Sequence, residues 1–175
     1  MKDYRERKYT VVSYDEKWKE VFQEEALHLK DILGEDALDI EHIGSTAIPG
    51  SSGKPTLDIL VLVGKIGIVE KYREKIEALG YKFLGEYVKE NSFLFVKEEN
   101  HTRLVQLHFF PKEHTHVQKM LKVRDYLRTH SDEALKYTEF KKELFKKYPD
   151  NYEQYKRLKS EYLEKLTQKA LEVLK

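Results

Sequence analysis

The strongest constraint on the fold is a loop of small residues that joins two apolar segments. Residues 38–43 and 56–63 have the composition of β-strands, and the second segment contains the continuous apolar run from Ile59 to Val63. A strand without polar alternation is typically buried on both faces, so residues 56–63 are expected near the centre of a sheet. The loop between the two strands is then expected at the mouth of that sheet, where its polar groups can meet a ligand.

This loop and the start of the second strand carry groups suited to an anion. Gly44 lets the backbone approach a phosphate closely, although a structural turn without a ligand could also require glycine. Ser45 and Thr46 add hydroxyl donors. Lys54 is predicted to contact a phosphate or another anion. The alternative is that Lys54-Pro55 only begins the strand, since proline is tolerated at the first residue of a strand. Asp58 is costly to bury unless it is paired, hydrogen-bonded or metal-bound. We therefore predict that these groups converge on one pocket.

The rest of the first 111 residues alternates between helical and strand-like patterns. Asp15 and Gly34 bound a helical pattern over residues 15–33, and Gly80 ends a second one over residues 66–79. Three further runs rich in β-forming residues follow, with Glu90-Asn91 read as a hairpin turn between the first two. These runs are residues 83–88, 92–96 and 103–110.

Beyond Pro111 the pattern is helical to the end, over residues 116–128, 132–148 and 151–174. The chain is therefore predicted to form an α/β (α+β) fold with a mixed sheet of about five strands flanked by helices. Residues 1–111 form the expected core, and residues 112–175 form a helical extension packed on it as a single structural unit.

Composition excludes several classes of protein. The 32 lysines and arginines nearly cancel the 31 aspartates and glutamates, so the whole chain has no strong field toward nucleic acid or membrane. The chain has no cysteine, which rules out a disulfide framework and thiolate zinc sites. Its longest apolar run is far shorter than the roughly 20 residues of a membrane helix. A cytoplasmic protein without membrane partners is expected.

Three segments carry a resemblance to a known family. The run from Glu41 to Gly50, with Lys54-Pro55 and Leu57-Asp58-Ile59, closely resembles the signature of the GrpB family. Leu107-His108-Phe109 and the run from Arg124 to Arg128 resemble further motifs of the same family. The resemblance implies a fold of the nucleotidyltransferase superfamily, similar to the palm of polymerase beta.

The same resemblance implies roles for individual residues. In the superfamily a Gly-Ser turn holds the triphosphate, which maps onto Gly44, Ser45 and Thr46, and a pair of acids one residue apart binds divalent metal. Asp58 would be the catalytic carboxylate, but Leu60 stands at the second acidic position and no acid lies in residues 104–110. Two magnesium ions therefore lack ligands here.

A single divalent ion, magnesium or manganese, on Asp58 and His108, with His42 as a further ligand, is the remaining metal hypothesis. Imidazole suits manganese better than magnesium. Strand histidines hydrogen-bonded to the backbone are the alternative reading of His42 and His108.

Arg124 and Arg128 share a helical face and could extend the positive charge of a phosphate pocket. Ion pairs with Asp125 or nearby glutamates are the alternative. Lys141 and Lys156 would join this pocket if the C-terminal helices fold over it.

Two classes of function remain open. One is an enzyme that binds a nucleotide or phosphorylated small molecule and transfers a nucleotidyl or phosphoryl group with the help of a metal. The other is a binding module that kept the pocket and lost the chemistry. Contact with RNA, suggested by the tyrosines and lysines of residues 151–174, is a weaker third reading that the near-neutral charge opposes.

Overall fold

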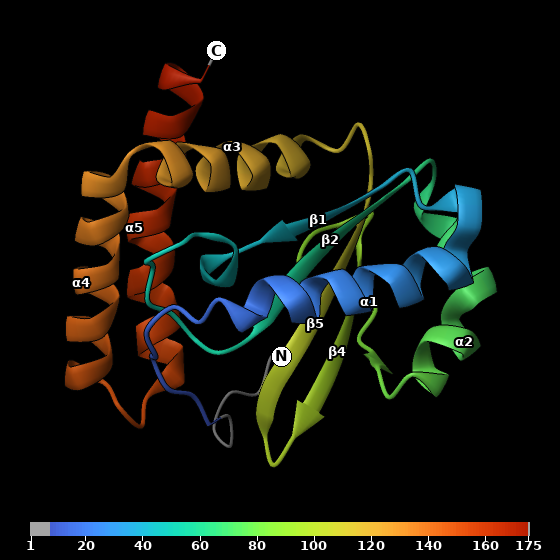
Figure 1. Cartoon of the computed structure of the whole chain (residues 1–175), viewed down its shortest axis with the longest axis horizontal. Coiled ribbons are helices and arrows are strands. Elements are labelled where there is room, and N and C mark those ends of the chain that lie inside the picture. The colour runs from blue at the N-terminus through green and yellow to red at the C-terminus, as the bar shows by residue number, and fades with distance from the viewer. Residues whose placement is uncertain (1–7, 175) are drawn as a thin grey trace.

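A five-stranded mixed sheet forms the centre of the computed structural model, which describes residues 8–174 (Figure 1). The strand order is β1-β2-β5-β4-β3, and β2 pairs in parallel with β5 while the other neighbours are antiparallel. The strands are β1 (Asp39–Ile43), β2 (Leu57–Val63), β3 (Lys82–Phe83), β4 (Phe93–Glu99) and β5 (Thr102–Pro111). The predicted mixed sheet with flanking helices is thus confirmed.

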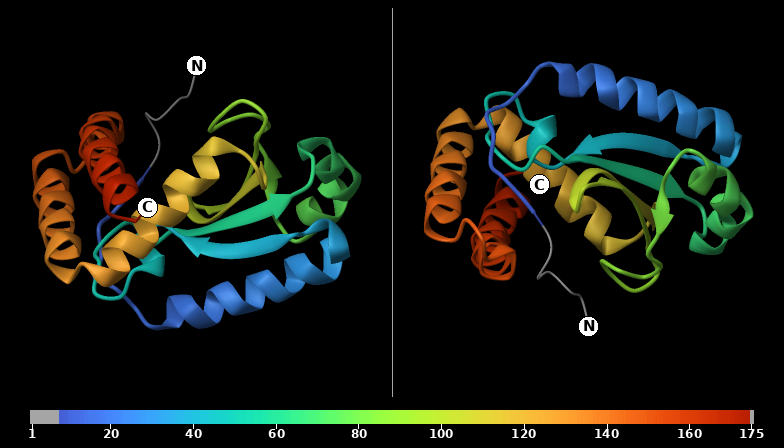
Figure 2. Two further views of the ribbon diagram at one scale, coloured as in Figure 1. Left: turned by 90° about the horizontal axis from the view of Figure 1, so that it is seen from above. Right: turned by 90° about the horizontal axis from the view of Figure 1, so that it is seen from below.

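Helices cover both faces of this sheet, and two more stand at one end of it (Figure 2). One face packs against α1 and α2, and the other face packs against α3. The hairpin of α4 and α5 lies at the sheet end where β1 leads into its loop (Figure 1). The helices are α1 (Lys17–Leu33), α2 (Arg73–Ala78), α3 (Thr115–Thr129), α4 (Ser131–Lys147) and α5 (Tyr152–Val173). Short 3-10 turns are η1 (Gly34–Asp36), η2 (Ser45–Ala47) and η3 (Ile66–Tyr72).

Alternation along β2 decides which residues can form a site. Ile59 and Val61 point to the α1 side of the sheet, where they are fully buried. Leu60 and Leu62 point to the α3 side, so Asp58 shares their face. A single polar residue on this central strand therefore faces the side on which the C-terminal helices gather.

Residues 84–92 differ from the sequence prediction. The expected strand over residues 83–88 shrinks to the two residues of β3, because the chain leaves the sheet at Gly85, whose φ is +66°. Glu90 and Asn91 do form a turn, and Asn91 has a φ of +54°, but this turn lies in the long connection between the antiparallel strands β3 and β4. A tight turn joins β4 to β5 at Asn100 and His101, which both have positive φ. Asparagine tolerates this conformation at low cost, so it can form the turn without glycine.

The C-terminal helices share an apolar cluster with the loop that follows β1. Ile48 packs with Tyr126, Leu127, Leu166 and Ala170. Residues 1–7 of the predicted core lie outside the described residues, and the division at residue 111 remains a prediction. Among the helices of residues 8–174, none has both the length and the apolar character that crossing a bilayer requires.

Candidate functional site

Gly44 ends β1 in a conformation that brings the loop against Asp58. Its φ is +76°, which side chains other than glycine rarely adopt. A Cβ atom at this position would lie 2.6 Å from Oδ2 of Asp58. Glycine is therefore required both by the turn and by the close approach of the carboxylate.

Replacing Gly44 with alanine is expected to destabilise the protein by about 1–3 kcal/mol, because a strained backbone and the displaced carboxylate both add cost. Chemical denaturation measures the change. Gly64→Ala is the matched control, since a Cβ there meets nothing within 4 Å. Equal stability of both variants would contradict the close packing of Gly44 on Asp58.

Ser45 is held by a buried lysine from α4. Lys141 Nζ donates to Ser45 Oγ at 2.8 Å and to Ser51 Oγ at 3.2 Å, and its side chain is 1% exposed. Burial, with a smaller contribution from the charge of Lys159, lowers the pKa of Lys141 to about 7. A Cβ on Gly53 would lie 2.6 Å from that of Ser45, so the loop is folded tightly around this contact.

Asp58 accepts hydrogen bonds from the neighbouring strand β5. Its Oδ1 accepts from Gln106 Nε2 at 2.9 Å and from His108 Nε2 at 3.1 Å. Burial opposes ionisation of Asp58, but the hydrogen bond and charge of His108 and the charges of Lys54 and Lys159 outweigh it, so its pKa is lowered. About a quarter of the Asp58 side chain remains exposed. Asp58 is therefore an ionised carboxylate at neutral pH.

Two further lysines lie around this carboxylate. Lys54 Nζ donates to Tyr152 Oη at 2.9 Å, which ties the loop to α5. Lys159, also on α5, interacts electrostatically with Lys54 and Asp58, and burial followed by repulsion from Lys54 lowers its pKa to about 8. Together these residues form what we call the lysine site: Ser45, Lys54, Asp58, Lys141 and Lys159.

The lysine site contains three of the residues singled out from the sequence, Ser45, Lys54 and Asp58. Lys141 had been considered only conditionally, and Lys159 was missed. A signal for both is present, because each interrupts the apolar stripe of an amphipathic helix: Lys141 lies between Tyr137 and Leu144, and Lys159 between Tyr155 and Tyr162. A lysine in such a stripe is expected to be buried or to face a ligand.

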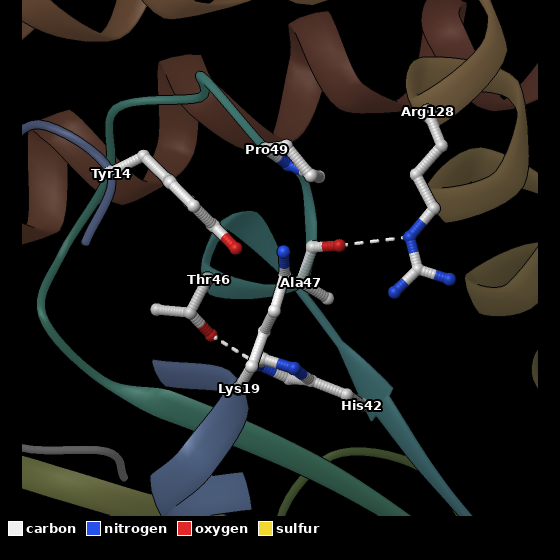
Figure 3. A pocket seen from close by; sticks show the side chains of 7 residues that line it. All are labelled: Tyr14, Lys19, His42, Thr46, Ala47, Pro49 and Arg128. Carbon is white, nitrogen blue, oxygen red and sulfur yellow. Dashed lines mark hydrogen bonds between the residues drawn. The ribbon is translucent and has the colours of Figure 1, made fainter. Parts of the chain in front are cut away.

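His42 and Thr46 lie on the opposite side of the loop. His42 Nε2 is hydrogen-bonded to Thr46 Oγ1 at 2.8 Å (Figure 3). The His42 ring also stacks on Phe22 of α1, with centroids 4.9 Å apart. Burial, followed by the charge of Arg128, lowers the pKa of His42 to about 4. Neither residue points to the face on which Asp58 lies, since Ile43, not His42, shares that face.

Of the predicted metal ligands, Asp58 and His108 are therefore brought together, whereas His42 faces the other side of the sheet. Within residues 8–174, no group of three or more histidines, aspartates or glutamates is arranged to hold an ion. His108 Nε2 is directed at Asp58 itself, and its other ring nitrogen, Nδ1, is buried without a hydrogen-bond partner. Leu60, at the second acidic position, is fully buried. These residues do not fit a pair of magnesium ions.

Arg124 also lies away from the lysine site. It donates to Glu41 and to the carbonyl of His42 through Nη1, and to Asp125 through Nε at 2.8 Å. Only 9% of its side chain is exposed. The structure thus shows the alternative, ion pairing of Arg124. The pair with Glu41 joins α3 to β1, and the pair with Asp125 lies within α3.

Comparison with known proteins identifies the family. The family model described as "GrpB protein" matches residues 8–169. The UPF0157 protein YqkA of Bacillus subtilis is 35% identical over 167 residues, which are 95% of this chain and 48% of that protein. The glutamate-rich protein GrpB of Alkalihalophilus pseudofirmus is 32% identical over 160 residues, 89% of this chain and 92% of that protein. The chain thus spans about half the length of the Bacillus relative.

A solved structure shows the same architecture. The crystal structure of the conserved protein GrpB from Enterococcus faecalis has a TM-score of 0.89 and 33% identity, and covers 94% of this chain and 99% of that chain. Cid1 in complex with a UTP analogue is far more distant, with a TM-score of 0.41 and 18% identity over 66% of this chain and 35% of that chain. The family match and the shared architecture lead to one conclusion: this chain belongs to the GrpB family.

Proposed function

We propose that this protein binds a nucleotide or another phosphorylated small molecule at the lysine site. The observation that carries the proposal is the meeting of three lysines, from the loop, α4 and α5, around Ser45 and a single carboxylate. Like charges held together at partly buried positions raise the free energy of the unliganded protein. A polyanion would relieve this repulsion, and ammonium and hydroxyl groups are suitable donors to its oxygens.

We assign roles in ligand binding to Ser45 and the three lysines of the site. Lys141 donates to Ser45 Oγ, so the hydroxyl proton of Ser45 is left to donate toward the ligand. Lys54 and Lys159 are only partly buried and would contact the phosphate oxygens directly. Lys141 is fully buried behind the loop and would act through Ser45 and through its charge.

The second candidate is nucleotidyl or phosphoryl transfer assisted by magnesium or manganese, with Asp58 as the catalytic carboxylate. It draws support from the position of ionised Asp58 beside the lysines. The donor set opposes it, because Asp58 Oδ1 already accepts from Gln106 and His108. We therefore favour a binding module that acts in the cytoplasm. RNA is a weaker candidate ligand, since Lys159 faces the site rather than an outer surface of α5.

Titration with a nucleoside triphosphate, followed by calorimetry and thermal denaturation, tests both candidates. A binding module predicts a higher melting temperature with no conversion of the triphosphate, with or without manganese. Transfer predicts release of pyrophosphate or phosphate that depends on manganese and disappears in Asp58→Asn. If neither triphosphates nor inorganic pyrophosphate raises the melting temperature, the proposal fails. Steeply salt-dependent binding of RNA in place of these ligands would favour the third candidate.

A further inference from the structure

A separate cavity of about 320 Å³ lies on the other side of the loop that carries Ser45 (Figure 3). It is bounded by the start of α1, the residues after β1 and the end of α3. The size is near the lower limit of ligand pockets, which occupy about 300–1,000 Å³. Its lining consists of Tyr14, Lys19, His42, Thr46, Ala47, Pro49 and Arg128. We call it the α1 cavity.

Two cations reach the α1 cavity from different helices. Figure 3 shows the side chains of Lys19 from α1 and Arg128 from α3 on either side of it, with the Tyr14 hydroxyl close to the Lys19 ammonium. Tyr14 interacts electrostatically with both Lys19 and Arg128, which is consistent with the three groups being neighbours. An anion placed between them would meet two positive charges and one hydroxyl donor.

The carboxylates near these cations leave room for a ligand. Lys19 pairs with Glu16 at 2.6 Å, but both side chains are more than half exposed, and such surface pairs contribute little. Arg128 lies 3.8 Å from Asp125, which accepts a closer bond, at 2.8 Å, from Arg124. Arg128 Nε is fixed by the carbonyl of Ala47 at 2.8 Å. The guanidinium is thus oriented without being neutralised by a close carboxylate.

The remaining walls are uncharged. His42 is neutral at physiological pH, since burial and Arg128 lower its pKa to about 4, and its Nε2 is occupied by Thr46. Ala47 and Pro49 supply apolar surface. A charged end and an apolar wall in a small cavity suit a compact organic anion better than a bare inorganic ion.

We propose that the α1 cavity binds a small organic anion whose carboxylate or phosphate lies between Lys19 and Arg128 and whose body contacts Ala47 and Pro49. This site is distinct from the lysine site, because Thr46 and His42 face one side of the loop and Ser45 faces the other. The proposal explains a part of the family signature, His42 and Thr46, that phosphate binding at Ser45 does not use.

Titration of the full chain with benzoate and with phenyl phosphate, followed by amide chemical shifts in NMR spectra, tests this proposal. Both ligands are expected to shift the amides of residues 14, 42, 46 and 128, and the tighter one identifies the acidic group that is preferred. Benzyl alcohol, the uncharged control ligand, should bind at least tenfold more weakly. Lys19→Met should weaken the tighter ligand at least tenfold, whereas Lys17→Met, an exposed neighbour on the same turn, should not.

Arg128→Met should weaken binding as much as Lys19→Met does. If loss of the hydrogen bond to the Ala47 carbonyl disturbs the fold of Arg128→Met, Lys19→Met alone decides the test. Three results would overturn the proposal: no shifts at the cavity, equal binding of benzyl alcohol, or equal loss in Lys17→Met and Lys19→Met. Loss of binding in Lys159→Met with no loss in Lys19→Met would assign the anion to the lysine site instead.

Discussion

Replacing Lys159 with methionine is expected to weaken triphosphate binding roughly 10- to 150-fold, the equivalent of one charged hydrogen bond of about 1.5–3 kcal/mol. Lys159 lies within electrostatic reach of Lys54 and Asp58, so its ammonium is placed for the ligand. The unliganded protein should be at least as stable as before, since the change removes repulsion between partly buried lysines. Calorimetry and thermal denaturation measure the two effects separately.

Lys165→Met is the matched control, because this lysine is exposed on a different face of the same helix. It should leave the affinity unchanged.

The pH dependence of sulfate affinity is a second test. The charge of sulfate is constant over this range, and its affinity should fall as pH rises above about 7–8. The pKa values of Lys141 and Lys159 are lowered to about 7 and about 8, so above them an anion must bind together with protons. Equal affinities of both variants, or affinity for sulfate that does not change with pH, would contradict the assignment.

Arg124→Met is expected to lower the free energy of unfolding by about 3–5 kcal/mol, which is the usual cost of breaking a buried ion pair from one side. The change leaves Glu41 and the carbonyl of His42 without their donor at the contact between α3 and β1. Such a loss is a large part of the total stability of a domain. Chemical denaturation monitored by circular dichroism measures it.

The control is Arg157→Met, which also breaks an ion pair, to Glu161 at 2.8 Å, but at a position where 57% of the arginine side chain is exposed. Its effect should stay within about 1 kcal/mol. If Arg124→Met is as mild as this control, while triphosphate affinity falls, then Arg124 contacts the ligand after all and its structural role is wrong.

Much of this fold could be predicted from the sequence because its core elements have unambiguous patterns. The apolar run of β2 identified an interior strand of the sheet, and the stripes of α1, α4 and α5 placed these helices within two residues of their observed ends. Residues 84–88 were mispredicted as a strand because their β-forming composition competes with Gly85, whose positive φ turns the chain out of the sheet. Local propensity does not reveal whether the segment stays in the sheet or turns away at Gly85.

The site was predictable only where its parts are close in sequence. Gly44, Ser45, Lys54 and Asp58 fall within fifteen residues and were recognised as one group. Lys159 interrupts the apolar stripe of a distant helix, which signals burial or ligand contact, but tertiary packing decides which site this helix meets. The helix motif with Arg124 suggested a phosphate contact, but the nearby acids Glu41 and Asp125 were the stronger partners once α3 packed on β1.

The turn of η2 lies between the lysine site on one side and the α1 cavity on the other. Ser45 faces the lysines, while Thr46 and Ala47 form a wall of the α1 cavity. Consecutive peptide groups cannot shift independently, because planar units and tight packing against Asp58 leave few free torsions. A ligand that displaces this turn from one side would therefore displace it on the other side as well. The turn would in this way couple the two proposed sites.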